Sequence, residues 1–259
     1  MNADHVYAIA MKDMKEAFSS ISIYGPMLGI PLFFAVVLPV FTVYISSYGG
    51  AAIAARLFGT AVAVPAGIGK NLLFIKFFAI NILGPIFLTM PIITASVIAA
   101  DSFSGEKERK TAESLFVTPA TNIELLMGKI LASLIPAFLL TVVVFVLYAG
   151  ITNYFTIAKF GAALFPNTSW YMMLVNAPFL ALTTIGTVVL VSARVRGVKE
   201  SQQISALLVL PILIIPFVSV FTVTSLSFMF LLYMLIFLLA TSALVLYLSI
   251  RFFDRERFI

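Results

Sequence analysis

The chain has 259 residues, of which 62% are hydrophobic and only 10% are charged, and its mean hydropathy is +1.12. Soluble domains carry about 25% charged residues, so this composition indicates an all-α integral membrane protein. The net charge of +5 comes from basic residues that flank apolar runs, which favours membrane flanks over nucleic-acid binding. There is no cysteine and one histidine, His5, so no catalytic, cofactor or metal site is expected.

Six apolar runs are long enough to cross a bilayer, whose hydrocarbon core of about 30 Å takes about 20 residues of helix. They cover residues 22–46, 77–100, 130–150, 171–193, 204–221 and 226–250. The segments between these runs are too short to bury a core of their own. Residues 1–259 are therefore expected to form a single transmembrane domain of six helices, with both termini on one side.

The first residues predict an amphipathic helix that lies in the membrane interface before the first span. Its apolar face is expected to consist of Tyr7, Met11, Met14 and Phe18. Its polar face is expected to consist of His5, Lys12, Asp13, Lys15 and Glu16. Such a helix serves either as a simple anchor or as an elbow that transmits motion, and its residues leave both possibilities open.

The basic residues are distributed unequally, because 12 of the 16 lie on one side of the predicted spans. The positive-inside rule places both termini and the segments 101–129 and 194–203 in the cytoplasm. The acids fall on the same side, and none lies deep within a span, although Asp101 borders the second. Carriers driven by protons or sodium commonly use acids inside the membrane, so a transporter without buried acids or bases is favoured, powered from elsewhere.

Prolines are frequent in the predicted spans, where each one removes a helical hydrogen bond and tends to kink the helix. Most are expected to be ordinary packing kinks, since proline is common in membrane helices. Pro211 and Pro216, close together in the fifth span, are the best candidates for a hinge.

The stretch from Asp101 to Lys129 is the only long polar interruption among the apolar runs. Unpaired charges and backbone polar groups are costly in lipid, so this stretch is expected to lie in water on the cytoplasmic side. Opposite charges at i,i+4 spacing would stabilise a helix leading out of the second span. The two pairs are Glu106 with Lys110 and Arg109 with Glu113.

A break and a second helix are expected to follow within the same stretch. Leu115–Val117 would form an exposed apolar knob, and Thr118–Pro119 ends the first helix because a residue before proline disfavours the α conformation. Thr121 and Glu124 form a capping box that starts the second helix, which continues into the third span. An apolar centre framed by charge is typical of protein interfaces, so the stretch is predicted to dock a soluble partner rather than to be a solvated loop.

These residues resemble the signature of ABC-2 type permeases, the membrane subunits of one group of ATP-driven exporters. The signature runs roughly E-K-E-x-G-T-x-E-x-L-L-x-x-P, followed a few residues later by E-x-x-x-G-K. Two positions depart from it, because Lys110 stands in place of the glycine and Phe116 in place of the second leucine. The resemblance implies that the ATPase-coupling residues are Glu106, Glu108, Arg109, Thr111, Glu113, Leu115, Phe116, Val117, Thr118, Pro119, Glu124, Gly128 and Lys129.

The resemblance implies a permease that pairs with a second permease subunit and docks a separate ATPase through a short coupling helix after the second span. The chain would lie in the cell membrane, and export is the usual direction in the family. The chain is not expected to be an enzyme, because Gly67–Asn71, its nearest approach to a phosphate-binding loop, fails the required pattern. Spans without charges and 25 phenylalanines favour a lipidic or amphipathic substrate.

Three other classes compete with this interpretation. A secondary transporter or channel would work without any ATPase, and it is the main alternative. A membrane enzyme would need clustered catalytic acids or histidines, which the pattern does not offer. The scaffold of an energy-coupled importer is the third, and Ala193–Arg194 is the one motif that resembles that class.

Overall fold

The computed structural model describes residues 2–47, 70–109, 111, 120–195, 197–221 and 227–253, and these residues are almost entirely helical. The helices in chain order are α1 (Ala3–Ser19), α2 (Ile21–Ser47), α4 (Lys70–Phe77), η1 (Phe78–Ile82), α5 (Leu83–Ala100), η2 (Asp101–Gly105), α6 (Glu106–Glu108), α7 (Asn122–Phe160), α8 (Thr168–Ser192), α9 (Val198–Phe221) and α10 (Phe228–Phe252). The all-α membrane fold predicted from composition is confirmed.

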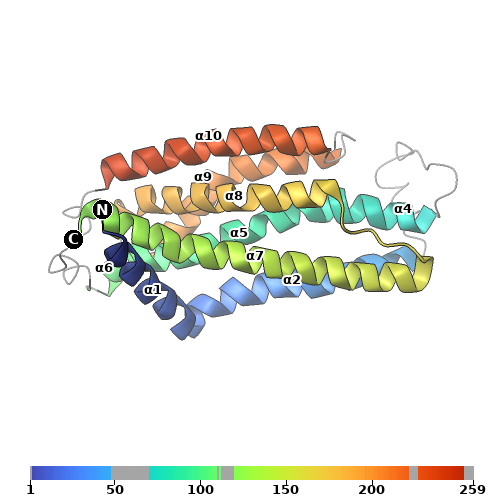
Figure 1. The fold of residues 1–259 in the computed structure, drawn as a ribbon, viewed down its shortest axis with the longest axis horizontal. Helices are drawn as coiled ribbons and strands as arrows, with labels where there is room; N and C mark the ends of the chain where they lie inside the picture. Colours follow the sequence, from blue (N-terminus) through green and yellow to red (C-terminus); the bar gives the residue numbers. More distant parts are fainter. Residues whose placement is uncertain are drawn as a thin grey trace.

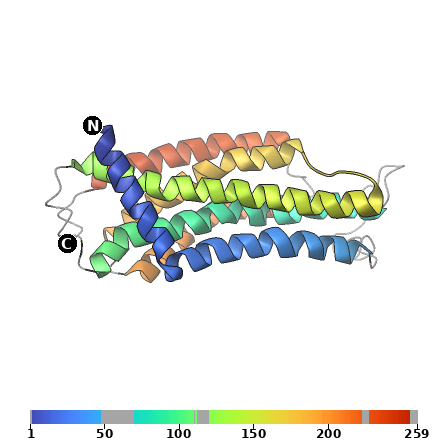
Figure 2. The ribbon, with the colours of Figure 1, turned by 60° about the horizontal axis from the view of Figure 1, so that its bottom comes forward.

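The long helices lie side by side along one axis (Figure 1). The elements from α4 to α6 follow one another without a break and form a single rod. α1 lies across α7 and the end of that rod, and then leads into α2 (Figure 2). α1 begins at the same end of the bundle at which α10 finishes (Figure 1), and this end is called the α1 end below.

α8 lies at the centre of the bundle and packs against α5, α7, α9 and α10. Towards the opposite end, an aromatic cluster fills the space between α5, α7 and α8. The ring of Phe87 lies 4.4 Å from that of Tyr148 and 5.0 Å from that of Trp170. Edge-on and stacked aromatic contacts of this kind each contribute about 0.5–1.5 kcal/mol beyond the area that they bury.

The closest approach between α8 and α10 depends on a glycine. A Cβ atom at Gly186 would lie 2.6 Å from Cγ1 of Val245, closer than side chains tolerate. The hydroxyl of Ser249 donates a hydrogen bond across the same contact to the carbonyl of Gly186, at 3.0 Å. Small residues that allow backbones to approach are typical of helix contacts in membranes.

Five helices in the described residues are long and apolar enough to cross a membrane: Ile23–Ser46, Phe74–Glu108, Asn122–Phe160, Thr168–Ser192 and Phe228–Phe252. The region of the predicted fifth span is also helical, as α9, but its role as a span stays a prediction. The helices Phe74–Glu108 and Asn122–Phe160 are much longer than the apolar runs 77–100 and 130–150 from which they were predicted. Hydropathy marks only the apolar part of a helix, whereas backbone hydrogen bonding continues into polar residues.

A helix, α1, is present where the sequence predicted an amphipathic interfacial helix, whose place in the membrane interface stays a prediction. The side chains that it buries are Val6, Ala10, Asp13 and Ala17. Tyr7 and Phe18, from the predicted apolar face, are 66% and 47% exposed in the bundle, whereas Asp13, which was assigned to the polar face, is buried. Small side chains let α1 approach α7 closely, and the face with the larger apolar residues is left outward, as an interfacial helix would require.

Two π-helical segments interrupt the rod between α4 and α6, and the sequence analysis did not predict either of them. Such segments often occur at functional sites, because they change which residues face a neighbouring helix. The first is η1, and the second is η2, all of whose residues are buried.

The hinge candidate Pro211 lies exposed within the continuous helix α9, whereas the side chain of Pro216 is outside the described residues.

Candidate functional site

A cluster of charged side chains lies at the α1 end, where α1, the end of the α4–α6 rod and α7 meet. It consists of Lys12 and Asp13 from α1, Ser102 and Glu106 from the rod, and Lys129 from α7; these five residues are called the charged cluster. Lys129 lies at its centre and is only 2% exposed. Asp13, Ser102 and Glu106 are buried as well.

The ammonium group of Lys129 has a partner on each neighbouring element. It lies 2.8 Å from Oε2 of Glu106 and 3.3 Å from Oδ2 of Asp13. It also donates to the carbonyl oxygen of Ser102 at 2.6 Å, and the Ser102 hydroxyl donates to Asp13. A buried ammonium is tolerated only when its charge and its donors are satisfied, as they are here.

Lys12 lies at the exposed edge of the charged cluster. Its ammonium group lies 3.2 Å from Oε1 of Glu106 and 3.6 Å from Oδ1 of Asp13, so the two lysines and the two acids balance in charge. Partial burial acts to lower the pKa of Lys12, but the negative charges of Asp13 and Glu106 outweigh it and raise that pKa above its usual value. Lys12 therefore remains charged at neutral pH.

A second ion-pair group surrounds Arg109, just after α6. Its guanidinium lies 2.9 Å from Oδ1 of Asp101 and 2.9 Å from Oε1 of Glu16. The hydrogen bond to Asp101 is the main cause that raises the pKa of Arg109. Gly105 lies beneath this bridge, and a Cβ atom there would be 2.8 Å from Asp101 Oδ1. A glycine is therefore needed where the ion pair passes over the helix backbone.

The next two residues of α6 contact the ends of α8 and α9. The ammonium group of Lys107 donates to the carbonyl of Ser192, the last residue of α8, at 2.7 Å. A carboxylate oxygen of Glu108 accepts from the backbone N–H of Val198, the first residue of α9, at 3.1 Å. A cation at a helix C-terminus and an anion at a helix N-terminus both stabilise the helix dipole. Together with Glu106, these residues connect α6 to α1, α7, α8 and α9.

The start of α7 is held by a capping box, as predicted. The hydroxyl of Thr121 accepts from the backbone N–H of Glu124 at 3.3 Å, and the carboxylate of Glu124 accepts from the N–H of Thr121 at 2.9 Å. Glu124 also accepts from the N–H of Asn2 and lies 3.3 Å from Nδ1 of His5. Glu124 thus caps α7 and binds the first turn of α1 to it.

Gly128 forms the closest contact between α7 and α1. A Cβ atom at this position would lie 2.7 Å from both Cβ and Cγ2 of Ile9, and 3.1 Å from the carbonyl oxygen of Val6. The two residues of the Gly-Lys motif therefore have separate structural roles. Gly128 allows the backbone of α1 to approach α7, and Lys129 forms ion pairs with Asp13 of α1 and Glu106 of the rod.

The predicted coupling residues fall into two groups. Those that the structure describes lie around the charged cluster or beside it: Glu106, Glu108, Arg109, Thr111, Glu124, Gly128 and Lys129. Thr111 closes the turn after α6, where its backbone N–H donates to the carbonyl of Glu106 at 2.9 Å. The others are outside the described residues, and their coupling role stays a prediction: Glu113, Leu115, Phe116, Val117, Thr118 and Pro119.

One expectation about charge needs correction, and the expected i,i+4 ion pairs stay a prediction. The interior of the bundle does hold acids and a base, because Asp13, Asp101, Glu106 and Lys129 are buried at the α1 end. Glu106 and Arg109 have partners on other helices, whereas the expected i,i+4 partners Lys110 and Glu113 are outside the described residues. The burial of these charges was not predicted because their partners lie far away in the chain.

The charged cluster is not shaped as a ligand site. The crevice beside Asp13, Asp101 and Arg109 has a volume of only about 10 Å³, which is about the space of one water molecule. Within the described ranges, no three His, Cys, Asp or Glu side chains are grouped so that they could hold a metal ion. The arrangement instead joins helices, because Lys129 of α7 is paired with acids of both α1 and the rod.

The family model described as ABC-2 family transporter protein matches residues 7–232, which include most of α1, the α4–α6 rod and α7. No curated protein matches the chain. The resemblance drawn from the signature residues is thus confirmed, and the chain belongs to the ABC-2 transporter family, whose members are multi-pass membrane permeases of ABC transporters.

Proposed function

We propose that the chain is a permease subunit that receives mechanical force from a separate ATPase through the segment 106–129. The observation that supports this proposal is the position of α6. Its three residues contact α1, α7, α8 and α9 through Glu106, Lys107 and Glu108. A displacement of the segment by a docked ATPase would therefore act on four helices at once. The segment is proposed to lie in the cytoplasm of the cell, with both termini on the same side.

The complete transporter is proposed to contain two permease subunits, two ATPases and a pathway for an amphipathic or lipidic substrate, moved outwards. Support for the substrate class comes from the distribution of charge. The buried acids and bases of the described helices lie at the α1 end, and the buried surface beyond them is apolar with scattered hydroxyl and amide groups. A pathway of this character suits a molecule with a large apolar part better than a bare ion.

One observation favours the alternative of an ion-coupled secondary transporter, namely the buried acids of the charged cluster. Carriers of that kind use buried acids as proton or ion relays. Asp13 and Glu106 are nevertheless each paired with a lysine, and the adjoining crevice holds about one water. The discriminating experiment is transport by the purified chain in vesicles. Uptake driven by an ion gradient without any ATPase would support the alternative.

The coupling proposal predicts the effect of Phe116→Ala. If Phe116 inserts into a cleft of the ATPase, its truncation should weaken assembly by about 2 kcal/mol, which is roughly a thirtyfold loss of affinity. The measurement is co-purification of the ATPase with the variant, together with the melting profile of the permease alone. Lys199→Ala, at an exposed lysine of α9, is the control and should leave assembly unchanged.

Retention of full ATPase binding and full transport by Phe116→Ala would contradict the docking role of the segment. An unaltered melting profile is needed for the comparison, because a destabilised permease would also lose its partner. Glu106→Lys is a second variant with a different mechanism. It places a third cation beside Lys12 and Lys129, so it should reduce stability and coupling together.

The proposed orientation predicts a labelling pattern. Single cysteines at Lys199, in the first turn of α9, and at Arg251, in the last turn of α10, are exposed and should react only with reagents applied from the cytoplasm. A cysteine at Thr168, the exposed first residue of α8, should react only from outside. The chain has no native cysteine that would interfere. Reaction of Lys199→Cys and Thr168→Cys from the same side would contradict the proposed topology.

A further inference from the structure

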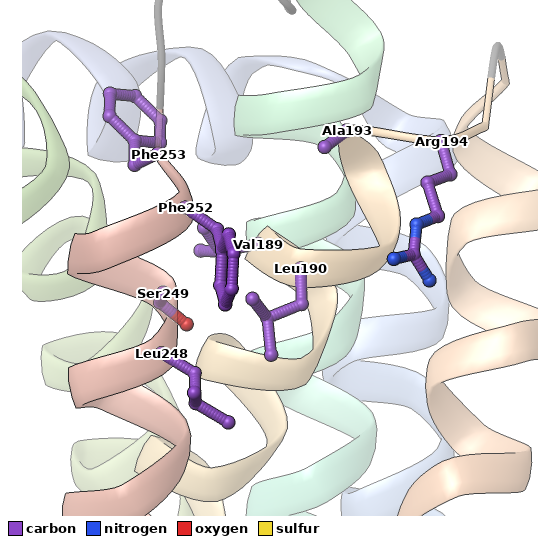
Figure 3. A pocket seen from close by; sticks show the side chains of 8 residues that line it. All are labelled: Val189, Leu190, Ala193, Arg194, Leu248, Ser249, Phe252 and Phe253. Carbon is purple, nitrogen blue, oxygen red and sulfur yellow. The ribbon is translucent and has the colours of Figure 1, made fainter.

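A groove lies between α8 and α10, at the α1 end where both helices finish (Figure 3). Its volume is about 270 Å³. Its walls are mainly apolar, with Val189 and Leu190 from α8 and Leu248 and Phe252 from α10. Arg194 is the only charged residue among those that line it in the described chain.

The groove follows from how the two helices meet. Near Gly186, α8 and α10 are in close contact, with the Ser249 hydroxyl bonded to the Gly186 carbonyl. Nearer the α1 end the wall of α8 is formed by Ala193, which fills little space. The helices thus separate into an open groove at the level where α8 ends at Ser192 and α10 ends at Phe252.

Arg194 reaches back beside the last turn of α8, so that its guanidinium lies near the level of Leu190 (Figure 3). Its side chain is exposed, and no acid in the described part of the chain forms an ion pair with it. A guanidinium beside apolar surface presents a planar fork of donors that suits the two oxygens of a phosphate group. The groove therefore offers an apolar wall and one phosphate-binding cation.

We propose that this groove binds one anionic phospholipid, with the headgroup phosphate on Arg194 and an acyl chain against Leu248 and Phe252. The depth fits, because Arg194 comes just after the apolar helix α8, and basic residues that flank a membrane span lie at the level of the headgroups. The volume of the groove also fits part of a lipid. Sites that enclose a whole small molecule have volumes of about 300–1,000 Å³, and this groove is slightly smaller. The remainder of the lipid would stay in the bilayer. On the orientation proposed above, this is the cytoplasmic leaflet, which carries anionic lipids.

The groove is connected to the charged cluster by two aromatic rings. Phe253, at the end of the groove, lies 6.3 Å from the ring of Phe103 in an edge-on contact. The ring of Phe103 in turn lies 5.3 Å from the ammonium group of Lys129. A lipid that orders Phe253 would therefore support the packing around Lys129, and its binding is expected to raise the melting temperature of the bundle.

The test uses the full chain in a neutral detergent, to which phosphatidylglycerol or phosphatidylcholine with identical acyl chains is added. Bound lipid is counted by native mass spectrometry, and the melting temperature is recorded in parallel. The wild type should retain phosphatidylglycerol in preference to phosphatidylcholine and be stabilised by it. Arg194→Gln should weaken the binding of phosphatidylglycerol about tenfold, the usual effect of losing a hydrogen bond to a charged group.

The matched control is Arg251→Gln, which removes an exposed arginine of α10 beside the groove but not among its lining residues. It changes the net charge equally and should leave lipid binding unchanged. Ala193→Leu fills the groove while keeping Arg194, and it should lower the binding of both lipids. Melting profiles without lipid establish that each variant is folded, and Arg194→Lys should have an intermediate affinity because it keeps the charge but not the fork.

Glycerol phosphate, which has the phosphate but no acyl chain, separates a lipid site from a site for a free phosphate. It should not displace phosphatidylglycerol at millimolar concentration if the apolar wall contributes to binding. The proposal is overturned by equal retention of the two lipids by the wild type, by equal losses in Arg194→Gln and Arg251→Gln, or by displacement with glycerol phosphate.

Discussion

Replacement of Lys129 by methionine is expected to destabilise the bundle by about 3–5 kcal/mol, the usual cost of removing one partner from a buried ion pair. Methionine fills a similar volume, so the loss would come from charge rather than from a cavity. It would leave Asp13 and Glu106 buried together, with only Lys12 at the exposed edge to balance them. The measurement is the free energy of unfolding in detergent, followed by the fluorescence of Trp170, the single tryptophan.

The control for this experiment is Lys199→Met, at an exposed lysine of α9, which should change stability by less than about 0.5 kcal/mol. A triple variant, Asp13→Leu/Glu106→Met/Lys129→Met, separates charge from packing. Apolar residues often replace a buried ion network without loss, so the triple variant should recover most of the stability. A wild-type stability for Lys129→Met alone would show that the charged cluster contributes little to holding the helices together.

Replacement of Gly128 by leucine is expected to force α1 away from α7 and to cost about 3 kcal/mol, the upper part of the usual range for overpacking. Even its Cβ atom would lie 2.7 Å from Ile9 and 3.1 Å from the backbone of Val6, which has no other position to take without moving α1. The same movement would draw Asp13 away from Lys129. The expected result is a lower melting temperature, with loss of ATPase binding in the assembled transporter.

The matched control is Gly150→Leu in the same helix, because no described atom outside the backbone of α7 lies within 4 Å of a Cβ at Gly150. That variant should be as stable as the wild type, since leucine favours helix over glycine. The double variant Ile9→Gly/Gly128→Ala removes both clashing atoms of Ile9 and should be more stable than Gly128→Ala alone. If Gly128→Leu and Gly150→Leu behave alike, the contact between α1 and α7 is not close in solution.

Local patterns allowed much of the fold to be predicted. An apolar run of about 20 residues forms a helix wherever it lies, so the long helices could be located from hydropathy alone. The capping box of Thr121 and Glu124 spans four residues and was likewise visible in the sequence. The family signature lies in the same short region, which is why the class of transporter could be inferred before any helix was placed.

The charged cluster could not be predicted, because its bonds join residues that are far apart in the chain. Lys129 and Asp13 are separated by 116 positions, and Lys12 and Glu106 by 94. Such pairs depend on which helices are neighbours, and hydropathy does not contain that information. The face of α1 that is buried in the bundle was not predicted, for a related reason. It contains the small residues Ala10 and Ala17, and its burial depends on which helices lie next to α1.

The length of α7 would enlarge any motion that the proposed coupling produces at the charged cluster. At 1.5 Å per residue, its 39 residues extend about 58 Å, nearly twice the about 30 Å of hydrocarbon that a helix must cross. Lys129 lies near the start of α7, so on the proposed coupling α7 would act as a lever that pivots about Lys129. A tilt of about 5° there would move the far end of α7, near Phe160, by about 4 Å. Distances between spin labels at that end of α7 and on α10, recorded with and without nucleotide, would measure this displacement.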